Sequence, residues 1–119
     1  MLRKDSLEIT PTDRQYIVEK VRAAPSNLIL ITHGTDTMIE TARALRGIPG
    51  KVIVLTGAMQ PAEFRRTDAQ FNLGGAIIAL QTLKEGVYIV MNGRVFDPDH
   101  VVKNQSSERF EGTDGDNPS

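Results

Sequence analysis

Residues 28–37 read LILITHGTDT, an unbroken apolar run that passes directly into a short polar segment. An apolar run of this length fits a strand that is covered on both faces, as in a parallel sheet. Residues 51–55, KVIVL, and residues 87–91, VYIVM, have the same character. Helical patterns alternate with these runs, so the sequence predicts an α/β fold, a three-layer sandwich with a mainly parallel sheet.

Three helices are expected between and before these strands. The first begins with a capping-box pattern at Thr12 and ends before Pro25, and the second begins with the same kind of pattern at Thr37. Residues 56–67 combine Gly, Pro and charged side chains, which favours an irregular segment. Asp68 is then expected to cap the third helix.

The end of the chain contains a hairpin signal and a polar tail. Asn92 and Gly93 form the dipeptide most typical of a two-residue turn, so residues 94–96 are expected to pair back against the preceding strand. We therefore interpret residues 1–111 as one partial α/β domain. Residues 112–119 are polar and contain Gly, which is typical of a disordered tail.

Composition excludes several classes of function. Fourteen Lys and Arg balance fifteen Asp and Glu, and aromatic residues make up 5% of the chain. This composition provides neither a basic footprint nor stacking rings for nucleic acid, and no attraction to an anionic membrane. The chain has no Cys, so thiolate chemistry is absent. No apolar run has the length of a signal peptide or a membrane span, and we expect a cytoplasmic protein.

The segments that follow the first two strands are the candidate site. In open α/β sheets ligands bind beyond the carboxyl ends of the strands, where Gly34 and Gly57 allow close approach of the backbone. A purely structural interpretation is also open, because Thr37 serves equally well as a helix cap and Asp36 suits the positive end of the helix dipole. His33, beside a buried strand, is expected to pack or to hydrogen-bond locally.

The polar segment also resembles a known motif. Residues 32–42, THGTDTMIETA, are similar to a signature of the L-asparaginase family, and residues 55–61, LTGAMQP, resemble its second loop. Further segments that resemble the family follow in the same order along the chain. They are Asp68 with residues 71–73, residues 90–93 and residues 102–104. It extends from about residue 5 to about residue 110. It implies the asparaginase N-terminal domain, a Rossmann-like or flavodoxin-like fold.

The resemblance also implies roles for individual residues. The expected catalytic group is a threonine, an acid and a lysine base, namely Thr35, Asp36 and Lys103. The expected substrate-binding residues are Ser6, Gly34, Thr35, Asp36, Ala58 and Met59, with backbone N–H groups near Gly34, Thr35 and Ala58 able to stabilise an oxyanion. No metal and no organic cofactor is implied. The substrate class is an asparagine-like side-chain amide, whose hydrolysis releases ammonia.

Two departures from the family pattern qualify this expectation. The 119 residues contain no Thr-Gly-Gly-Thr segment, which in the family carries the primary nucleophile, and Leu7 stands where family members carry a polar Gln or Glu. We therefore expect a fold without the family's first strand, with an unpaired sheet edge, and weak or no activity of this chain alone. The alternative is a non-catalytic amino-acid-binding or assembly module. Either form is expected to be a homo-oligomer, a dimer or tetramer.

Overall fold

The computed structural model describes residues 2–4, 11–59, 62–104 and 109–113. Three helices are described: α1 (Pro11–Ala23), α2 (Met38–Ala44) and α3 (Ala62–Thr82). The strands are β1 (Leu2–Lys4), β2 (Leu28–His33), β3 (Val52–Thr56), β4 (Gly86–Met91), β5 (Arg94–Phe96), β6 (Val101–Asn104) and β7 (Arg109–Gly112).

Five strands form the central sheet, in the order β1-β2-β3-β4-β5. The first four run parallel and β5 is antiparallel to β4, so the predicted mainly parallel sheet is confirmed. The register pairs Ile31 with Leu55 and Thr32 with Thr56. Because β2 and β3 are parallel and in this register, the polar segments that follow them leave the sheet side by side.

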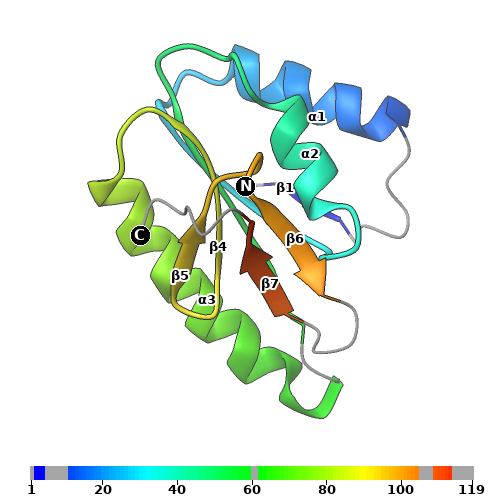
Figure 1. Ribbon diagram of the computed structural model, residues 1–119. Coiled ribbons are helices and arrows are strands. Elements are labelled where there is room, and N and C mark those ends of the chain that lie inside the picture. Colours follow the sequence, from blue (N-terminus) through cyan, green and yellow to red (C-terminus); the bar gives the residue numbers. More distant parts are fainter. Residues whose placement is uncertain (1, 5–10, 60–61, 105–108, 114–119) are drawn as a thin grey trace.

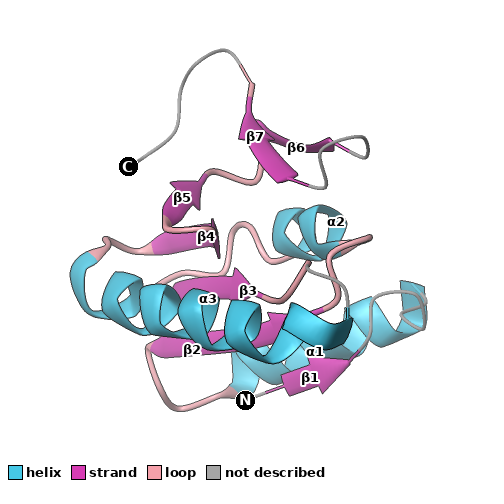
Figure 2. Cartoon of the chain, turned by 90° about the horizontal axis from the view of Figure 1, so that it is seen from below, coloured by secondary structure: helices cyan, strands magenta, loops and turns pink. Residues whose placement is uncertain are grey.

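Helices cover both faces of the sheet, which makes the three layers of the predicted sandwich (Figures 1 and 2). On one face α1 and α2 pack into the larger apolar cluster, which includes Val21, Met38 and Leu45. On the other face Ala76 and Ala79 of α3 pack against strand residues in a second cluster. The sheet is therefore buried on both sides, which is why its strands are unbroken apolar runs.

The predicted hairpin is present. Asn92 and Gly93 both have positive φ, 54° and 74°, and Met91 pairs with Arg94 across the turn. Two successive positive φ values are the requirement of a type I′ turn, which Asn-Gly meets with the least strain. β5 covers residues 94–96, as expected.

The third helix begins earlier than predicted. α3 starts at Ala62, so the second half of the segment 56–67 that we expected to be irregular is helical, and Asp68 lies inside the helix instead of capping it. No Pro or Gly lies between Ala62 and Asp68, so nothing in that stretch opposes a helix. The carboxylate of Asp68 instead accepts a hydrogen bond from the Met59 N–H at 2.6 Å.

The two capping-box predictions were wrong. Thr12 is already within α1, which begins at Pro11, a residue that suits a first helical position. Thr37 does occupy the N-cap of α2, but its side chain makes no capping hydrogen bond. Its φ of −123° and ψ of 17° do not match the extended backbone that this kind of capping uses.

A three-residue strand, β1, covers part of the edge beside β2, and β1 is itself the terminal strand of the sheet among the described residues. β1 pairs with β2 in parallel, with Leu2 opposite Ile31 and Lys4 opposite His33. At the other end of the chain, Gly112 closes β7 and the Thr113 N–H donates to the His100 carbonyl at 2.8 Å. Regular structure therefore extends into the first part of the segment expected to be a tail, and residues 114–119 lie outside the described residues. Among the described helices, none combines the length and apolar character needed to cross a membrane.

Candidate functional site

Lys103 joins the two catalytic candidates of the first polar segment. Its Nζ donates to Thr35 Oγ1 at 2.9 Å and to Asp36 Oδ1 at 2.8 Å. The Lys103 side chain is 13% exposed, whereas that of Asp36 is 44% exposed. The three predicted catalytic residues therefore meet at one point, although Lys103 is 68 positions from Thr35 in the sequence.

The small β6–β7 sheet carries Lys103 to this position. Val101 of β6 and Phe110 of β7 are buried in the larger apolar cluster, and the Phe110 ring lies 6.4 Å from that of Phe96, between centroids. Lys103 pairs with Phe110 across the hairpin. Burial of these apolar neighbours fixes the strand against the α2 face of the main sheet and leaves the Lys103 amine at the carboxyl end of β2.

His33 holds the start of the same segment. Its ring is 4% exposed; Nε2 lies 2.9 Å from Thr41 Oγ1, and Nδ1 lies 2.6 Å from the Gly34 carbonyl oxygen. A carbonyl can only accept, so Nδ1 carries the proton in this contact. The Arg14 Nε–H also donates to Thr41 Oγ1, at 3.2 Å. His33 thus links α1, α2 and the loop that carries Thr35, in agreement with the local hydrogen-bonding role expected of it.

The second polar segment is held by α3. Asn72 is 1% exposed, and its Nδ2 donates to the Gly57 carbonyl at 2.8 Å and to Asp68 Oδ1 at 3.1 Å. The Met59 N–H donates to the other carboxylate oxygen of Asp68. Asn72 Oδ1 accepts from the Asn92 N–H at 2.9 Å, at the turn between β4 and β5. The loop after β3 is therefore fixed at two points by one face of α3.

The two polar segments touch at Gly57. A Cβ added there would lie 2.3 Å from the His33 carbonyl oxygen and 3.0 Å from Met38 Cε. The first distance is far below any tolerated carbon–oxygen contact, and the oxygen belongs to the backbone. Gly57 is therefore required by its close approach to the backbone of His33. The sequence predicted close approach to a ligand at this glycine, which stays a prediction.

A second polar cluster ties α2 to the segment between β5 and β6. The Arg43 Nε–H donates to the Pro98 carbonyl at 2.8 Å, and Arg46 pairs with Asp99. The hydrogen bond from Arg46 lowers the pKa of the Asp99 carboxyl. The pKa of the Tyr88 hydroxyl is raised, chiefly by partial burial and to a smaller extent by the negative charge of Asp97. These contacts hold the connection that leads to Lys103.

The structure brings some of the predicted site residues into contact and places others in the neighbouring loop. Thr35, Asp36 and Lys103 are in contact, and Gly34 adjoins them. Ala58 and Met59 lie in the neighbouring loop, which is in contact with the first at Gly57. Ser6 lies outside the described residues. Sequence analysis did not predict that Asn72 and Asp68 fasten this loop. A signal was present, because Asn72 lies four residues before Ala76 on the buried face of α3, where a polar residue requires a partner.

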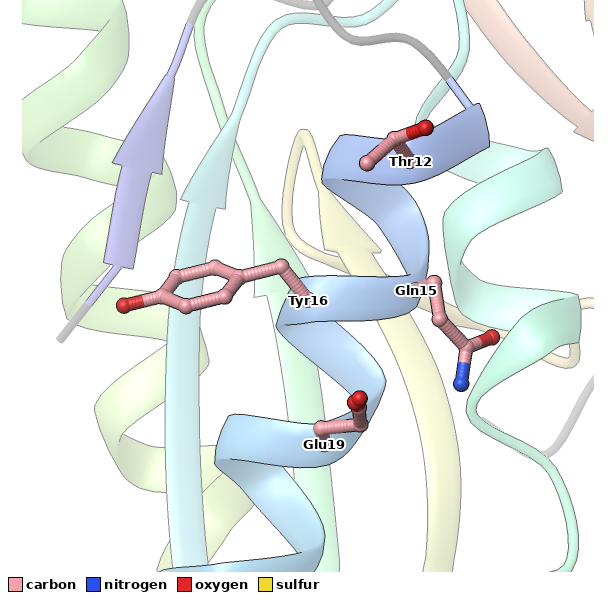
Figure 3. Close-up of a pocket in the computed structure, with 4 residues that line it drawn as sticks. All are labelled: Thr12, Gln15, Tyr16 and Glu19. Carbon is pink, nitrogen blue, oxygen red and sulfur yellow. The ribbon is translucent and has the colours of Figure 1, made fainter.

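The described surface also has an open hollow of about 460 Å³, on α1 (Figure 3). It is lined by Thr12, Gln15, Tyr16 and Glu19. None of the site residues predicted from the sequence lies in this lining. The hollow has no lysine–hydroxyl contact, so it is a weaker candidate than the Lys103 cluster.

Comparison with known proteins agrees with this geometry. A family model described as "Asparaginase, N-terminal" matches residues 1–113. L-asparaginase 1 of Escherichia coli strain K12 is 34% identical over 105 residues, which cover 83% of this chain and 31% of that protein. The probable L-asparaginase of Deinococcus radiodurans is 36% identical over 112 residues, covering 86% of this chain and 34% of that protein.

A solved structure gives the same result. The crystal structure of a probable cytoplasmic L-asparaginase from Campylobacter jejuni is similar with a TM-score of 0.79 and 29% sequence identity. The similarity covers 92% of this chain and 38% of that one. The chain therefore spans about a third of the length of the curated relatives it matches.

Proposed function

The chain belongs to the asparaginase family, and we propose that its Lys103 cluster takes part in hydrolysis of the side-chain amide of L-asparagine or a closely related amide. The observation that carries this proposal is the contact of one lysine nitrogen, Lys103 Nζ, with both Thr35 Oγ1 and Asp36 Oδ1. A threonine hydroxyl is a poor nucleophile until a neighbouring base takes its proton. Lys103 is the group placed to exchange that proton.

The proposed reaction has two steps. With the lysine amine in its neutral form, a threonine oxygen attacks the amide carbon while its proton passes to that amine. The resulting ammonium then gives a proton to the leaving nitrogen, and the tetrahedral intermediate expels ammonia. The resulting ester is hydrolysed by water, which returns the threonine hydroxyl and releases a carboxylate. Overall, one amide and one water give one carboxylic acid and one ammonia. In the complete family site the first attack belongs to the Thr-Gly-Gly-Thr segment, with Thr35 as the second threonine.

Asp36 has a second proposed role. One of its carboxylate oxygens is bonded to Lys103, and the carboxylate is 44% exposed, so it is accessible to a substrate. A cationic α-amino group is the substrate feature that such a carboxylate would bind. Ser6, Gly34, Ala58 and Met59 are the proposed contacts for the rest of the substrate.

Activity of these 119 residues alone is proposed to be weak or absent, because no Thr-Gly-Gly-Thr segment is among them. Loss of a nucleophile costs several orders of magnitude in rate, although positioning and oxyanion contacts leave some catalysis. The second candidate function is an amino-acid-binding module without turnover, which Leu7 favours because it cannot replace a polar substrate contact. We also propose a homo-oligomer and a cytoplasmic location.

The test is ammonia release from L-asparagine, with L-glutamine and D-asparagine in parallel. The 119-residue chain is compared with a version extended at its N-terminus by the Thr-Gly-Gly-Thr segment of a relative. We expect activity in the extended version and little in the shorter chain. Saturable binding of L-asparagine without ammonia release in either version would favour the binding module instead. Thr35→Ala should abolish any residual rate of the shorter chain if Thr35 replaces the missing nucleophile.

A further inference from the structure

In the loop after β3, some peptide groups are hydrogen-bonded to α3 and others are not. The Gly57 carbonyl is taken by Asn72 Nδ2, and the Met59 N–H is taken by Asp68 Oδ2. Among the described residues, no group accepts a hydrogen bond from the Ala58 N–H. The Ala58 N–H and the Ala58 carbonyl, which are the other halves of these two peptides, are thus left available to a ligand among the described residues.

The direction of that N–H follows from peptide geometry. The described chain has no cis peptide, and in a trans peptide the C=O and the N–H point in opposite directions. Since the Gly57 carbonyl points at Asn72 on α3, the Ala58 N–H of the same peptide points away from α3. α3 packs on one face of the sheet, with Ala76 and Ala79 in the smaller apolar cluster.

The opposite face is where the lysine lies. Met38 of α2 and Val101 of β6 belong to the larger cluster, so α2 and the β6–β7 sheet share the face that α3 does not cover (Figure 1). Lys103 of β6 reaches Thr35 and Asp36 from this side. The contact between Gly57 and the His33 carbonyl places the two loops directly against each other.

From these contacts we infer that Asn72 and Asp68 are positioning residues that aim the Ala58 N–H toward the Lys103 side of the sheet edge. There it would donate to an oxygen that carries negative charge, either the oxyanion of amide hydrolysis or a carboxylate of the product. The identity of that oxygen rests on the proposed function. The aiming of the peptide does not, because it follows from contacts within the chain.

The Asn72 side chain is suited to hold the loop because it is buried and both its nitrogen and its oxygen are hydrogen-bonded. Its Nδ2 donates to two acceptors and its Oδ1 accepts from the Asn92 N–H. Asn92 has a φ of 54°, so the same amide also fastens a turn in a left-handed conformation. A buried side-chain amide with three fixed hydrogen-bond partners has one orientation, so it holds the Gly57 carbonyl in one direction.

The experiment is amide hydrogen exchange and NMR on the 119-residue chain with Asn72→Ala, and with Gln70→Ala on the exposed side of α3 as the matched control. Loss of the loop's fastening should make the Met59 amide exchange about tenfold faster or more, with shifts of the Ala58 resonance, while amides in β2 stay protected. Unchanged exchange and unchanged resonances of residues 57–59 in a folded Asn72→Ala protein would overturn the inference. Gln70→Ala should alter neither.

Asp68→Asn provides a milder variant if Asn72→Ala does not fold. An amide has one carbonyl oxygen where the carboxylate has two, so it cannot accept from both the Met59 N–H and Asn72 Nδ2 in the present geometry. The Met59 amide should again exchange faster. Normal protection of that amide in a folded Asp68→Asn protein would also overturn the inference.

Titration with L-aspartate distinguishes aiming from simple stabilisation. In the unaltered chain L-aspartate should shift the Ala58 amide resonance together with those of Thr35 and Asp36. In Asn72→Ala the Ala58 shift should be lost while the other two persist. A persistent Ala58 shift would mean that Asn72 is only structural. If L-aspartate shifts no resonance even in the version extended by the Thr-Gly-Gly-Thr segment, the proposed function fails, and the exchange measurement still decides whether Asn72 and Asp68 position the loop.

Discussion

At the scale of single residues, the site depends on a position that has no room for a side chain as well as on the side chains that are present. Gly57 is the clearest case, since a Cβ there would meet backbone and not a flexible side chain. The loops that carry Thr35 and Ala58 can therefore approach only if this position has no side chain. Gly74, in the middle of α3, has no atom within 4 Å of an added Cβ.

These two glycines give a matched pair of predictions. Gly57→Ala should lower the free energy of unfolding by about 2 kcal/mol, because the two loops must separate. Gly74→Ala should raise it by about 0.5–1 kcal/mol, because alanine loses less backbone entropy in a helix. Urea denaturation measures both. A Gly57→Ala protein as stable as the unaltered chain would contradict the close approach of the loops.

The residues that the sequence motif selected lie together in the structure, while their catalytic roles stay a prediction. Asp36 and Lys103 are 67 positions apart, and no periodicity or local pattern connects residues at that separation. The family resemblance selected them, and the structure brings their side chains into contact. Asn72 was overlooked because its partners, Gly57 and Asn92, belong to two other segments of the chain.

At the scale of elements, the central strands, the end of α1 before Pro25 and the start of α2 after Thr37 were predictable, and the start of α3 was not. β2, β3 and β4 are covered by helices on both faces, so each is an apolar run that stands out from its surroundings, and Asn92-Gly93 determines its turn locally. The start of α3 was misplaced because Glu63, Arg65 and Arg66 are as compatible with an exposed helical turn as with a loop. The β6–β7 sheet was not predicted, since its four-residue strands pair only with each other.

Lys51 is predicted to join α1 to the sheet. Its side chain is buried, and its Nζ donates to the carbonyls of Ala24 and Ser26 at 2.8 and 2.6 Å, just beyond the end of α1. Lys51→Met should lower the free energy of unfolding by about 1–3 kcal/mol, since two charge-assisted hydrogen bonds are lost. Lys84→Met, at an exposed lysine, should change it by less than about 0.5 kcal/mol. Equal effects of the two variants in urea denaturation would contradict this role.

Asp99 should make the connection between α2 and β6 sensitive to acid. Its pKa is lowered in the folded chain, chiefly by the hydrogen bond from Arg46, so its contribution to stability is present above the unfolded-state pKa of roughly 3.9 and is lost as the pH falls through the folded value. The unaltered chain should therefore be more stable than Asp99→Asn at pH 6, and the difference should vanish on acidification below pH 4. A difference that is constant from pH 6 to the acid end would contradict the assignment.

At the scale of the whole molecule, the chain is an asparaginase-family domain that spans about a third of the length of its relatives. Its described part holds a threonine, an acid and a lysine in contact, and a loop fastened by α3 beside them. The proposed homo-oligomer belongs to this scale as well. Light scattering on purified protein should give the mass of a dimer or tetramer, and a monomer at all concentrations would contradict that proposal.

If Lys103 is the base for amide hydrolysis, removing its amine must slow the release of ammonia. Ammonia release from L-asparagine is measured for the version extended by a Thr-Gly-Gly-Thr segment, with Lys103 intact and with Lys103→Met, and Lys84→Met is the control. We predict that Lys103→Met lowers the rate by about 10²–10⁴-fold, the range expected for loss of a general base, while Lys84→Met leaves it unchanged. No ammonia release from the extended chain, or a folded Lys103→Met protein with an undiminished rate, would contradict the account.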